Sequence, residues 1–338
     1  MTGFRSMLRD YLEYYKISQT DFADRLGISQ KHMNEIINGK TKISPELMIL
    51  ISLLTDIDVN LIFLAEQRKE TYDKLINEYK DEKEINKMLQ SYYLNDIVKK
   101  NWIKLKQPSS FVQNYLDLIE YLGVKDTSTI NSYLNKRFLF KKTETKTDNL
   151  KIYMWIKHCD NMIKGVEIEK YDSSKLDDLL KELEIERMKK YNPNRLIEIL
   201  HKYGIILYIE DALSGSKVRG CIKVMIDTPV IYMTTYMKEK SSFYYTLYHE
   251  LMHLKKDYNK LKNKTIIEED YIEDDIDKLA LECMISSNIY NDIINDYDHK
   301  EIIAKKNNIP LCFLYTRLAK EGKISYTSSN YRNNIEKI

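Results

Sequence analysis

Residues 19–54 read QTDFADRLGISQKHMNEIINGKTKISPELMILISLL and decide the fold expected for the N-terminal part of the chain. Ser18 and Ser29 are favourable N-cap residues, and each precedes a short amphipathic segment. Gly27 ends the first segment and permits a sharp turn into the second. The spacing therefore predicts a helix-turn-helix whose second helix spans residues 30–38.

The second helix of this motif carries the side chains expected to read DNA. Its first turn would enter the major groove, where Gln and Asn can bond adenine in two places. The start of the preceding helix offers backbone N–H groups that can hold a phosphate. The candidate DNA-contact residues are Gln19, Gln30, Lys31, His32, Asn34 and Lys40. A helical packing module without DNA contact, or one that binds protein only, is the alternative.

The whole run resembles the lambda-repressor/Cro-type (XRE) helix-turn-helix family across nearly all of residues 1–66. The resemblance implies a domain that binds double-stranded DNA.

The chain of 338 residues has 53 Lys+Arg and 51 Asp+Glu, a formal net charge of +2. This balance excludes a uniformly basic protein that coats nucleic acid. Tight operator binding is therefore expected to require a homodimer.

The amino-acid composition indicates the fold class and the cellular location of the protein. Hydrophobic residues make up 43% and charged residues 31%, as in folded globular proteins, and the 9 Gly and 5 Pro favour helices over an all-β fold. We expect a mainly α fold with a small β-sheet (α+β). The largely apolar run 47–54 is far shorter than the ~20 residues of a membrane span. The N-terminus has no signal-peptide core, and the 4 cysteines form no CxxC pair, which indicates a cytoplasmic protein with free thiols and no membrane partner.

The pattern divides the chain into three regions. We expect the helix-turn-helix domain in residues 1–66, a helical connector or middle region in 67–194, and a third domain in 195–338. The polar stretch 141–148 is the best candidate for a linker. After residue 204 the sequence predicts three short strands rich in Ile, Val and Tyr. These are IILYIED (205–211), KVRGCIKVMID (217–227) and PVIYMTT (229–235).

Residues 249–253 read HELMH, an HExxH motif. On a helix, His249 and His253 lie on the same face with ~6 Å of rise between them. Two imidazoles so placed can bind one Zn²⁺, and Glu250 can accept the proton of a metal-bound water as a general base. The alternative is a pair of core histidines bonded to backbone groups.

A catalytic zinc needs a third protein ligand and one open position. The acidic segment that follows the motif reads EEDYIEDDIDKLALECMIS (268–286) and is expected to be helical. Asp275 edges the apolar stripe of this helix, so spacing nominates it as the third ligand, with Glu273 in reserve.

The C-terminal region resembles the ImmA/IrrE family of zinc metallopeptidases over about residues 195–326. The matching runs are VRGCIKVMIDTPVIYMTTYMKEKSSFYYTLYHELMHL, DDIDKLALECMIS and IPLCFLYTRLAKEGKI. The resemblance implies a zincin-like fold in which His249 and His253 bind Zn²⁺ and Glu250 is the general base. It places the third ligand at Asp275, where the family usually carries the longer Glu.

An XRE module, a helical middle and an ImmA/IrrE domain occur in the same order in HigA-like antitoxins and phage-type regulators, which this chain resembles. The resemblance implies a DNA-binding regulator whose zinc-dependent endopeptidase domain cleaves a partner protein such as a repressor or toxin. The strand Val230–Thr234 is expected to pair with an extended peptide substrate. The alternative is a non-catalytic antitoxin or transcriptional repressor whose metallopeptidase-like domain is a sensor or a protein-binding scaffold.

Overall fold

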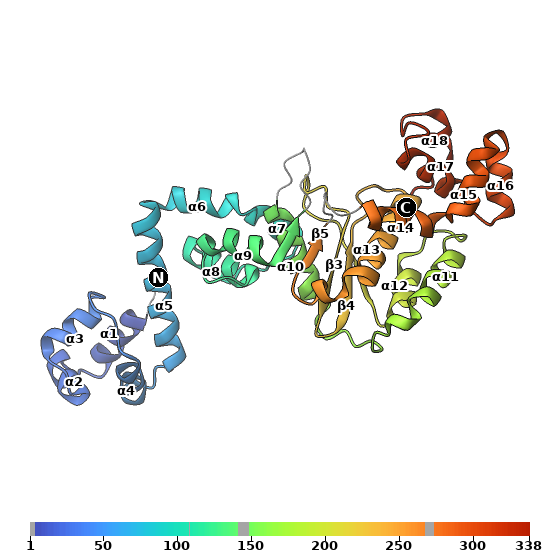
Figure 1. The fold of residues 1–338 in the computed structure, drawn as a ribbon. Coiled ribbons are helices and arrows are strands. Elements are labelled where there is room, and N and C mark those ends of the chain that lie inside the picture. The colour runs from blue at the N-terminus through green and yellow to red at the C-terminus, as the bar shows by residue number, and fades with distance from the viewer. Residues whose placement is uncertain (1–3, 108, 141–148, 268–273) are drawn as a thin grey trace. The chain divides into compact units, whose positions relative to one another are not determined.

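The computed structural model describes residues 4–107, 109–140, 149–267 and 274–338 (Figure 1). The chain divides into two compact units, Met1–Glu120 and Tyr121–Ile338. Helices dominate both units, and the second also holds a five-stranded sheet, so the expected mainly α fold with a small sheet is confirmed. Among the residues described, no helix is long and apolar enough to cross a membrane. The linker expected at 141–148 lies outside the described residues.

The first eight helices of the chain include two that begin at the N-cap residues predicted from the sequence. The hydroxyl of Ser18 accepts a hydrogen bond from the amide of Asp21 at 3.0 Å, and that of Ser29 accepts one from His32 at 3.1 Å. The helices are α1 (Phe4–Tyr14), α2 (Gln19–Leu26), α3 (Gln30–Ile37), α4 (Pro45–Thr55), α5 (Val59–Tyr79), α6 (Glu82–Ser91), α7 (Leu94–Lys99) and α8 (Phe111–Leu122).

The domain ends expected after residues 66 and 194 fall inside helices. α5 runs through residue 66, because its sequence contains neither Gly nor Pro to interrupt it. Residue 194 lies in the first turn of α12 (Pro193–Lys202). The division into two compact units falls between residues 120 and 121, within α8.

The helices α1 to α5 enclose one apolar core. Each contributes the residues of a single face, spaced three and four apart. The buried members are Phe4, Leu8, Leu12, Phe22, Ala23, Leu26, Met33, Ile36, Ile37, Ile43, Leu47, Met48, Ile51, Ile57 and Ile62. The first four helices are thereby fixed relative to one another, which leaves the opposite face of α3 available to a partner.

The sheet of the second unit has the order β1-β5-β3-β4-β2. Its strands are β1 (Phe138–Phe140), β2 (Ile206–Ile209), β3 (Gly220–Met225), β4 (Thr228–Met233) and β5 (Thr265–Ile267). β3 and β4 form an antiparallel hairpin, while β2 runs parallel to β4 and β1 parallel to β5. Ile226 and Asp227 connect the hairpin, and both have positive φ, as a tight two-residue turn requires.

The three strands predicted from the sequence correspond to β2, β3 and β4, but one expectation about them is wrong. β4 pairs with β3 on one side and β2 on the other. The backbone groups of Val230–Met233 are therefore used within the sheet, and this strand has no free edge to which a peptide substrate could be added.

Ten helices and three short 3₁₀ turns complete the described part of the second unit. The helices are α9 (Ile130–Arg137), α10 (Asn149–Met162), α11 (Leu176–Glu186), α12 (Pro193–Lys202), α13 (Lys240–Leu261), α14 (Asp274–Met284), α15 (Ser287–Asn295), α16 (Lys300–Lys306), α17 (Leu311–Lys320) and α18 (Ser329–Asn334). The turns are η1 (Thr127–Thr129), η2 (Ser173–Lys175) and η3 (Tyr297–His299). α13 packs against β3, α14 and α17, and so lies at the centre of the unit.

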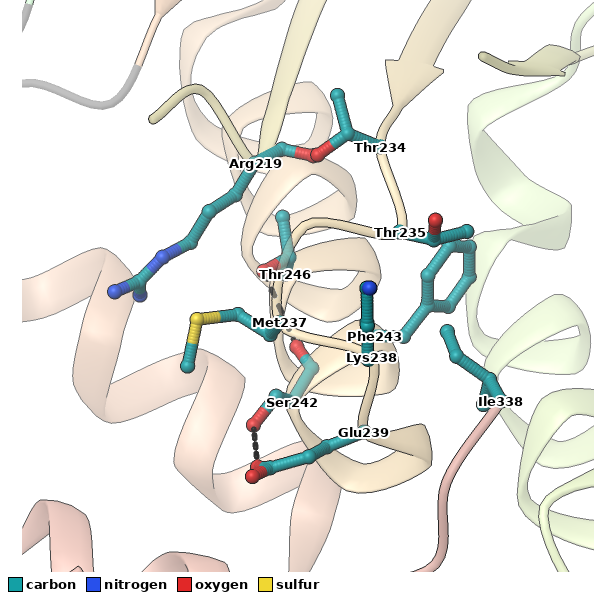
Figure 2. Close-up of a pocket in the computed structure, with 10 residues that line it drawn as sticks. All are labelled: Arg219, Thr234, Thr235, Met237, Lys238, Glu239, Ser242, Phe243, Thr246 and Ile338. Carbon is teal, nitrogen blue, oxygen red and sulfur yellow. Dashed lines mark hydrogen bonds between the residues drawn. The ribbon is translucent and has the colours of Figure 1, made fainter. Parts of the chain in front are cut away.

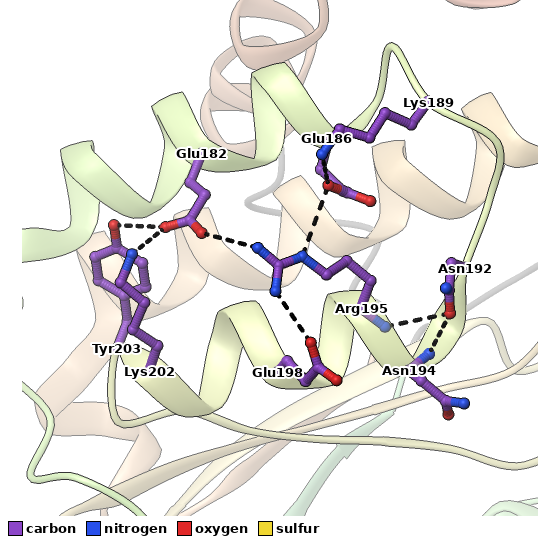
Figure 3. A network of polar contacts seen from close by, with 9 residues as sticks. All are labelled: Glu182, Glu186, Lys189, Asn192, Asn194, Arg195, Glu198, Lys202 and Tyr203. Atoms are coloured by element: carbon purple, nitrogen blue, oxygen red, sulfur yellow. Dashed lines mark hydrogen bonds and ion pairs between the residues drawn. The ribbon is translucent and has the colours of Figure 1, made fainter.

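A polar network ties α11 to α12 (Figure 3). The Arg195 guanidinium of α12 lies 3.7 Å from Glu182 and 3.9 Å from Glu186, both on α11. Glu182 also accepts hydrogen bonds from Lys202 at 2.7 Å and from the hydroxyl of Tyr203 at 3.0 Å. Both ends of α12 are therefore linked to α11, and α12 in turn contacts β2.

Candidate functional site

The turn between α2 and α3 has the geometry of a helix-turn-helix. Gly27 ends α2 with φ 68°, in the left-handed region where a side chain is strained. Its amide bonds the carbonyls of Ala23 and Asp24, which closes α2. α3 then begins directly after the Ser29 cap.

Most of the side chains predicted to touch DNA are exposed. Gln30, Lys31 and Asn34 lie on the solvent side of α3, whereas His32 is half-buried. Gln19, at the start of α2, and Lys40, after α3, are exposed as well. The opposite face of α3 is buried through Met33, Ile36 and Ile37, as suits the amphipathic segment seen in the sequence. The contacts with DNA remain predictions, but the helix presents these polar groups outward.

Two arginines of α1 hold the C-terminal end of α3. Arg5 donates from Nε to the carbonyl of Ile36 at 2.8 Å, and Arg9 donates from Nη2 to the carbonyl of Ile37 at 2.8 Å. The last carbonyls of a helix have no partner within the helix, so these bonds satisfy them and favour positive charge there. Arg5 is itself ion-paired with the buried carboxylate of Glu66 on α5. The orientation of α3 is therefore set by α1 and α5 together.

The second candidate site lies on α13. This helix is buried on all sides from Lys240 to Leu254, as expected of a helix in the middle of a core. His249 is 5% exposed, Glu250 0% and His253 4%. The HExxH motif thus lies on a helix, as the sequence predicts, and this helix is buried.

The two imidazoles of the motif converge. The Nε2 atoms of His249 and His253 lie 3.1 Å apart. With Zn–N bonds of about 2.05 Å and a tetrahedral angle, two imidazole ligands of one zinc ion have nitrogens about 3.3 Å apart. The observed separation fits a single ion between the two rings.

Carboxylates hold the other nitrogen of each ring. Nδ1 of His249 lies 3.0 Å from Oδ1 of Asp277 on α14, and Nδ1 of His253 lies 3.0 Å from Oδ2 of Asp257. The hydroxyl of Tyr245 also donates to Oδ1 of Asp277, at 2.5 Å. Such an outer carboxylate fixes the tautomer and orientation of a metal-binding histidine. The alternative was a pair of core histidines bonded to backbone groups. In the structure, the Nδ1 atoms of both rings contact carboxylates instead.

Ionisation at this cluster suits metal binding. Burial raises the pKa of Asp277, but hydrogen bonds from His249 and Tyr245 outweigh it and lower that pKa to about 2. Burial, and then the neighbouring His249, lower the pKa of His253 to about 4. At neutral pH, Asp277 is therefore ionised and the His253 imidazole is neutral, the form that binds a metal ion.

The residue predicted as third ligand stands apart from this pair. Asp275 is exposed on α14. Within the described ranges, no group of three or more His, Cys, Asp or Glu side chains is arranged to hold a metal ion. The reserve candidate, Glu273, lies outside the described residues. The structure thus brings the two histidines together and does not bring Asp275 to them.

The outer carboxylates were missed by sequence reasoning. Asp257 lies four residues after His253, a spacing that places both on one helix face and so was available as a signal. Asp277 borders the other side of the apolar stripe from Asp275, and spacing does not show which side of α14 faces His249.

Two buried arginines hold the end of α14. Arg187 donates from Nη1 to the carbonyls of Cys283 and Met284, each at 2.9 Å. Arg317, on α17, donates from Nη1 to the carbonyl of Leu281 at 2.9 Å. These bonds satisfy the terminal carbonyls of α14 and so fix the helix that carries Asp277.

A glycine makes room for the carboxylate of Glu250. A Cβ atom at Gly220 on β3 would lie 3.0 Å from Oε1 of Glu250, 3.0 Å from Cγ2 of Thr246 and 3.1 Å from Sδ of Met233. Glycine lets the strand approach α13 this closely without displacing these side chains. The pKa of the adjacent Cys221 thiol is raised by burial and by the Glu250 charge. Gly220 therefore shapes the pocket that holds the predicted base.

A small cavity lies one helical turn before the motif (Figure 2). Its volume is about 10 Å³, enough for one water molecule. Thr246 lines it together with Ser242, whose hydroxyl donates to Glu239 at 2.9 Å. This cavity is too small for a peptide side chain.

The comparisons with known proteins bear on the first unit. Residues 8–62 match the Helix-turn-helix family, which covers α2, α3 and α4 and most of α1. This confirms the predicted helix-turn-helix and identifies the N-terminal unit as that of a DNA-binding regulator. No curated protein and no solved structure matches the chain.

Proposed function

We propose that this DNA-binding regulator carries a zinc-dependent endopeptidase in its second unit, which cleaves a partner protein such as a repressor or toxin. The convergence of the His249 and His253 Nε2 atoms at 3.1 Å, next to the buried Glu250, supports the proposal most directly. The resemblance of residues 195–326 to the ImmA/IrrE metallopeptidases supplies the reaction class and is an analogy.

The chain's own residues would divide the work as follows. His249 and His253 would hold Zn²⁺ through Nε2. The metal, when bound, supplies the Lewis acidity that activates water and polarises a peptide carbonyl. Glu250 accepts the proton of the attacking water and passes it to the leaving amine. Asp277 and Asp257 keep the imidazoles oriented and their Nε2 atoms available to the metal.

On DNA, α3 would lie in the major groove with Gln30 and Asn34 toward base edges. Lys31 and Lys40 would contact phosphates, and Gln19 would hold a phosphate at the start of α2. A homodimer would place two such helices about 34 Å apart, one helical turn of DNA. α4 exposes an apolar face through Ile49, Leu50, Leu53 and Leu54, which supports a second copy as a partner.

The peptidase proposal is tested with Glu250→Gln in the full-length chain. Cells expressing the wild type or the variant are compared by mass spectrometry of protein N-termini. We expect new N-termini from a partner protein only with the wild type, while both chains bind zinc and shift operator DNA. Identical N-termini in the two samples would overturn the peptidase proposal.

The DNA proposal is tested on fragments selected from random duplexes by the wild-type chain. Gln30→Ala should lose sequence preference, whereas Lys31→Ala should weaken all sequences alike and reduce the salt dependence by about one phosphate contact. A chain that selects no sequence would support the reading in which the N-terminal unit binds protein only.

One observation favours a second candidate, a non-catalytic antitoxin or repressor in which the second unit is a sensor or scaffold. Asp275, which the sequence nominates as the third ligand, is exposed on α14. This candidate predicts that Glu250→Gln leaves the biological response to the partner protein unchanged.

A further inference from the structure

A cavity of about 270 Å³ lies in the second unit, away from the histidine pair. It is bounded by α9, α10, the end of α13 and the strands β1, β3 and β5. His249, Glu250 and His253 are not among its lining residues. Cations and aromatic rings dominate its lining. They are Arg137, Lys157, Lys223, Lys262, Lys264, Tyr133, Phe138 and Tyr153. Asp160 is the one carboxylate among the described residues that line it.

The one carboxylate named in this lining, Asp160, already has partners within the protein. Asp160 is ion-paired with Lys223 and accepts a hydrogen bond from the hydroxyl of Tyr232 at 2.6 Å. Lys262 pairs with Asp227 at 2.7 Å, outside the lining. Two of the five cations are therefore neutralised by carboxylates, and the cavity keeps an excess of positive charge.

The other three cations are left for a ligand. Among the residues that the structure describes, Arg137, Lys157 and Lys264 form no ion pair within 4 Å. Lys157 is half-buried, and its pKa is lowered by burial and by the charges of Lys223 and Lys164, although Asp160 opposes this. An anion in the cavity would offset that unfavourable environment, because it would pair with a charge that burial now destabilises.

An aromatic wall faces the same space. Tyr133 is 39% exposed, and its ring centroid lies 6.1 Å from Phe138 and 5.8 Å from Tyr153 in edge-to-face contacts. The packed rings hold Tyr133 in place and leave part of its surface open. A planar ring can stack on such a surface at little entropic cost.

We propose that this cavity binds a small phosphorylated molecule with a planar ring, of the mononucleotide class. Arg137, Lys157 and Lys264 would bind the phosphate, and Tyr133 would stack on the ring. Arginine and lysine are the side chains that bind phosphate best in proteins. The volume is close to the lower limit of small-molecule pockets, about 300 Å³. The inference is independent of the peptidase proposal, since it uses none of the same side chains.

Calorimetric titration of the full-length chain with AMP, GMP, CMP and UMP tests the proposal. We expect at least one of them to bind, adenosine and the other unphosphorylated nucleosides to bind at least tenfold more weakly, and ribose 5-phosphate to bind more weakly than the nucleotide. Lys157→Met and Lys264→Met should each weaken the nucleotide about tenfold, since each removes one charged hydrogen bond. Lys190→Met, an exposed lysine outside the cavity, is the control and should bind as the wild type does.

Three results would overturn the assignment. These are no heat of binding with any of the four nucleotides, equal affinity for nucleosides, or unchanged affinity in both Lys157→Met and Lys264→Met. Equal affinity for ribose 5-phosphate would contradict the stacking role of Tyr133. Both lysine variants are expected to fold, because the replaced groups are exposed or are themselves destabilised by burial.

Discussion

The Nε2 atoms of His249 and His253 lie 3.1 Å apart on α13, and each ring is anchored at Nδ1 by a different aspartate. The helix supplies the one-turn spacing, but spacing alone does not make two imidazoles converge. Asp277 reaches His249 from α14, and Asp257 reaches His253 from a kink in α13, where Asp257 itself has non-helical backbone angles. The convergence is thus a property of two helices and not of the motif alone.

Removing the outer carboxylate should weaken zinc binding without abolishing it. In Asp277→Asn the ring of His249 loses its ionised partner, and we expect the affinity for zinc to fall about 10–100-fold. Competition with a chromophoric chelator measures this. Asp275→Asn is the matched comparison on the same helix, and a loss as large as that of His249→Ala would make Asp275 the third ligand. Unchanged affinity in Asp277→Asn would contradict the orienting role.

Gly220→Ala should damage the reaction more than the metal site. The new Cβ would lie 3.0 Å from Oε1 of Glu250, so the carboxylate must move by a few tenths of an ångström. We expect cleavage to slow at least about tenfold, with zinc content unchanged and the free energy of unfolding lowered by about 1–3 kcal/mol. A variant that cleaves the partner at the wild-type rate would show that Glu250 does not depend on this packing.

Arg5→Ala should destabilise the DNA-binding unit. It leaves the buried carboxylate of Glu66 without its ion pair and the carbonyl of Ile36 without its donor. We expect a loss of about 3 kcal/mol in urea unfolding and weaker operator binding. Arg25→Ala, which breaks the exposed pair with Asp21 on α2, should change stability by less than about 1 kcal/mol. Equal losses in the two variants would contradict the role given to Arg5.

Acid should destabilise the second unit partly through His201. Burial lowers the pKa of His201 in the folded chain. In the unfolded chain, this pKa returns to about 6.5. As the pH falls through about 6.5, the unfolded chain binds this proton before the folded chain does, so the free energy of unfolding decreases. Urea unfolding at about pH 7.5 and about pH 5.5 should show a smaller decrease for His201→Gln than for the wild type. The same decrease in both chains would assign the acid sensitivity to other groups.

Local signals predicted much of the fold. The N-caps Ser18 and Ser29 and the stop at Gly27 define α2 and α3, because each acts on the backbone within three residues. β2, β3 and β4 were predictable from runs rich in Ile, Val and Tyr. β1 and β5 were not, since each has only three residues and exists by pairing with the other or with β3.

The site was predictable only in part, for the same physical reason. HExxH places its three side chains by helix geometry alone, and the structure buries all three. The partners of those side chains come from outside the motif. Asp277 depends on the rotation of α14 about its own axis, and Gly220 on the distance between β3 and α13. Neither the rotation of α14 nor the distance between β3 and α13 can be inferred from the residues of one segment.

Metal content tests the central claim most directly. The full-length chain, purified and equilibrated with zinc, is passed through gel filtration and analysed by elemental mass spectrometry beside His249→Ala and the exposed-histidine control His299→Ala. We predict about one zinc per chain in the wild type and in His299→Ala, and none in His249→Ala. A wild type without zinc, or a His249→Ala chain that keeps it, would contradict the account.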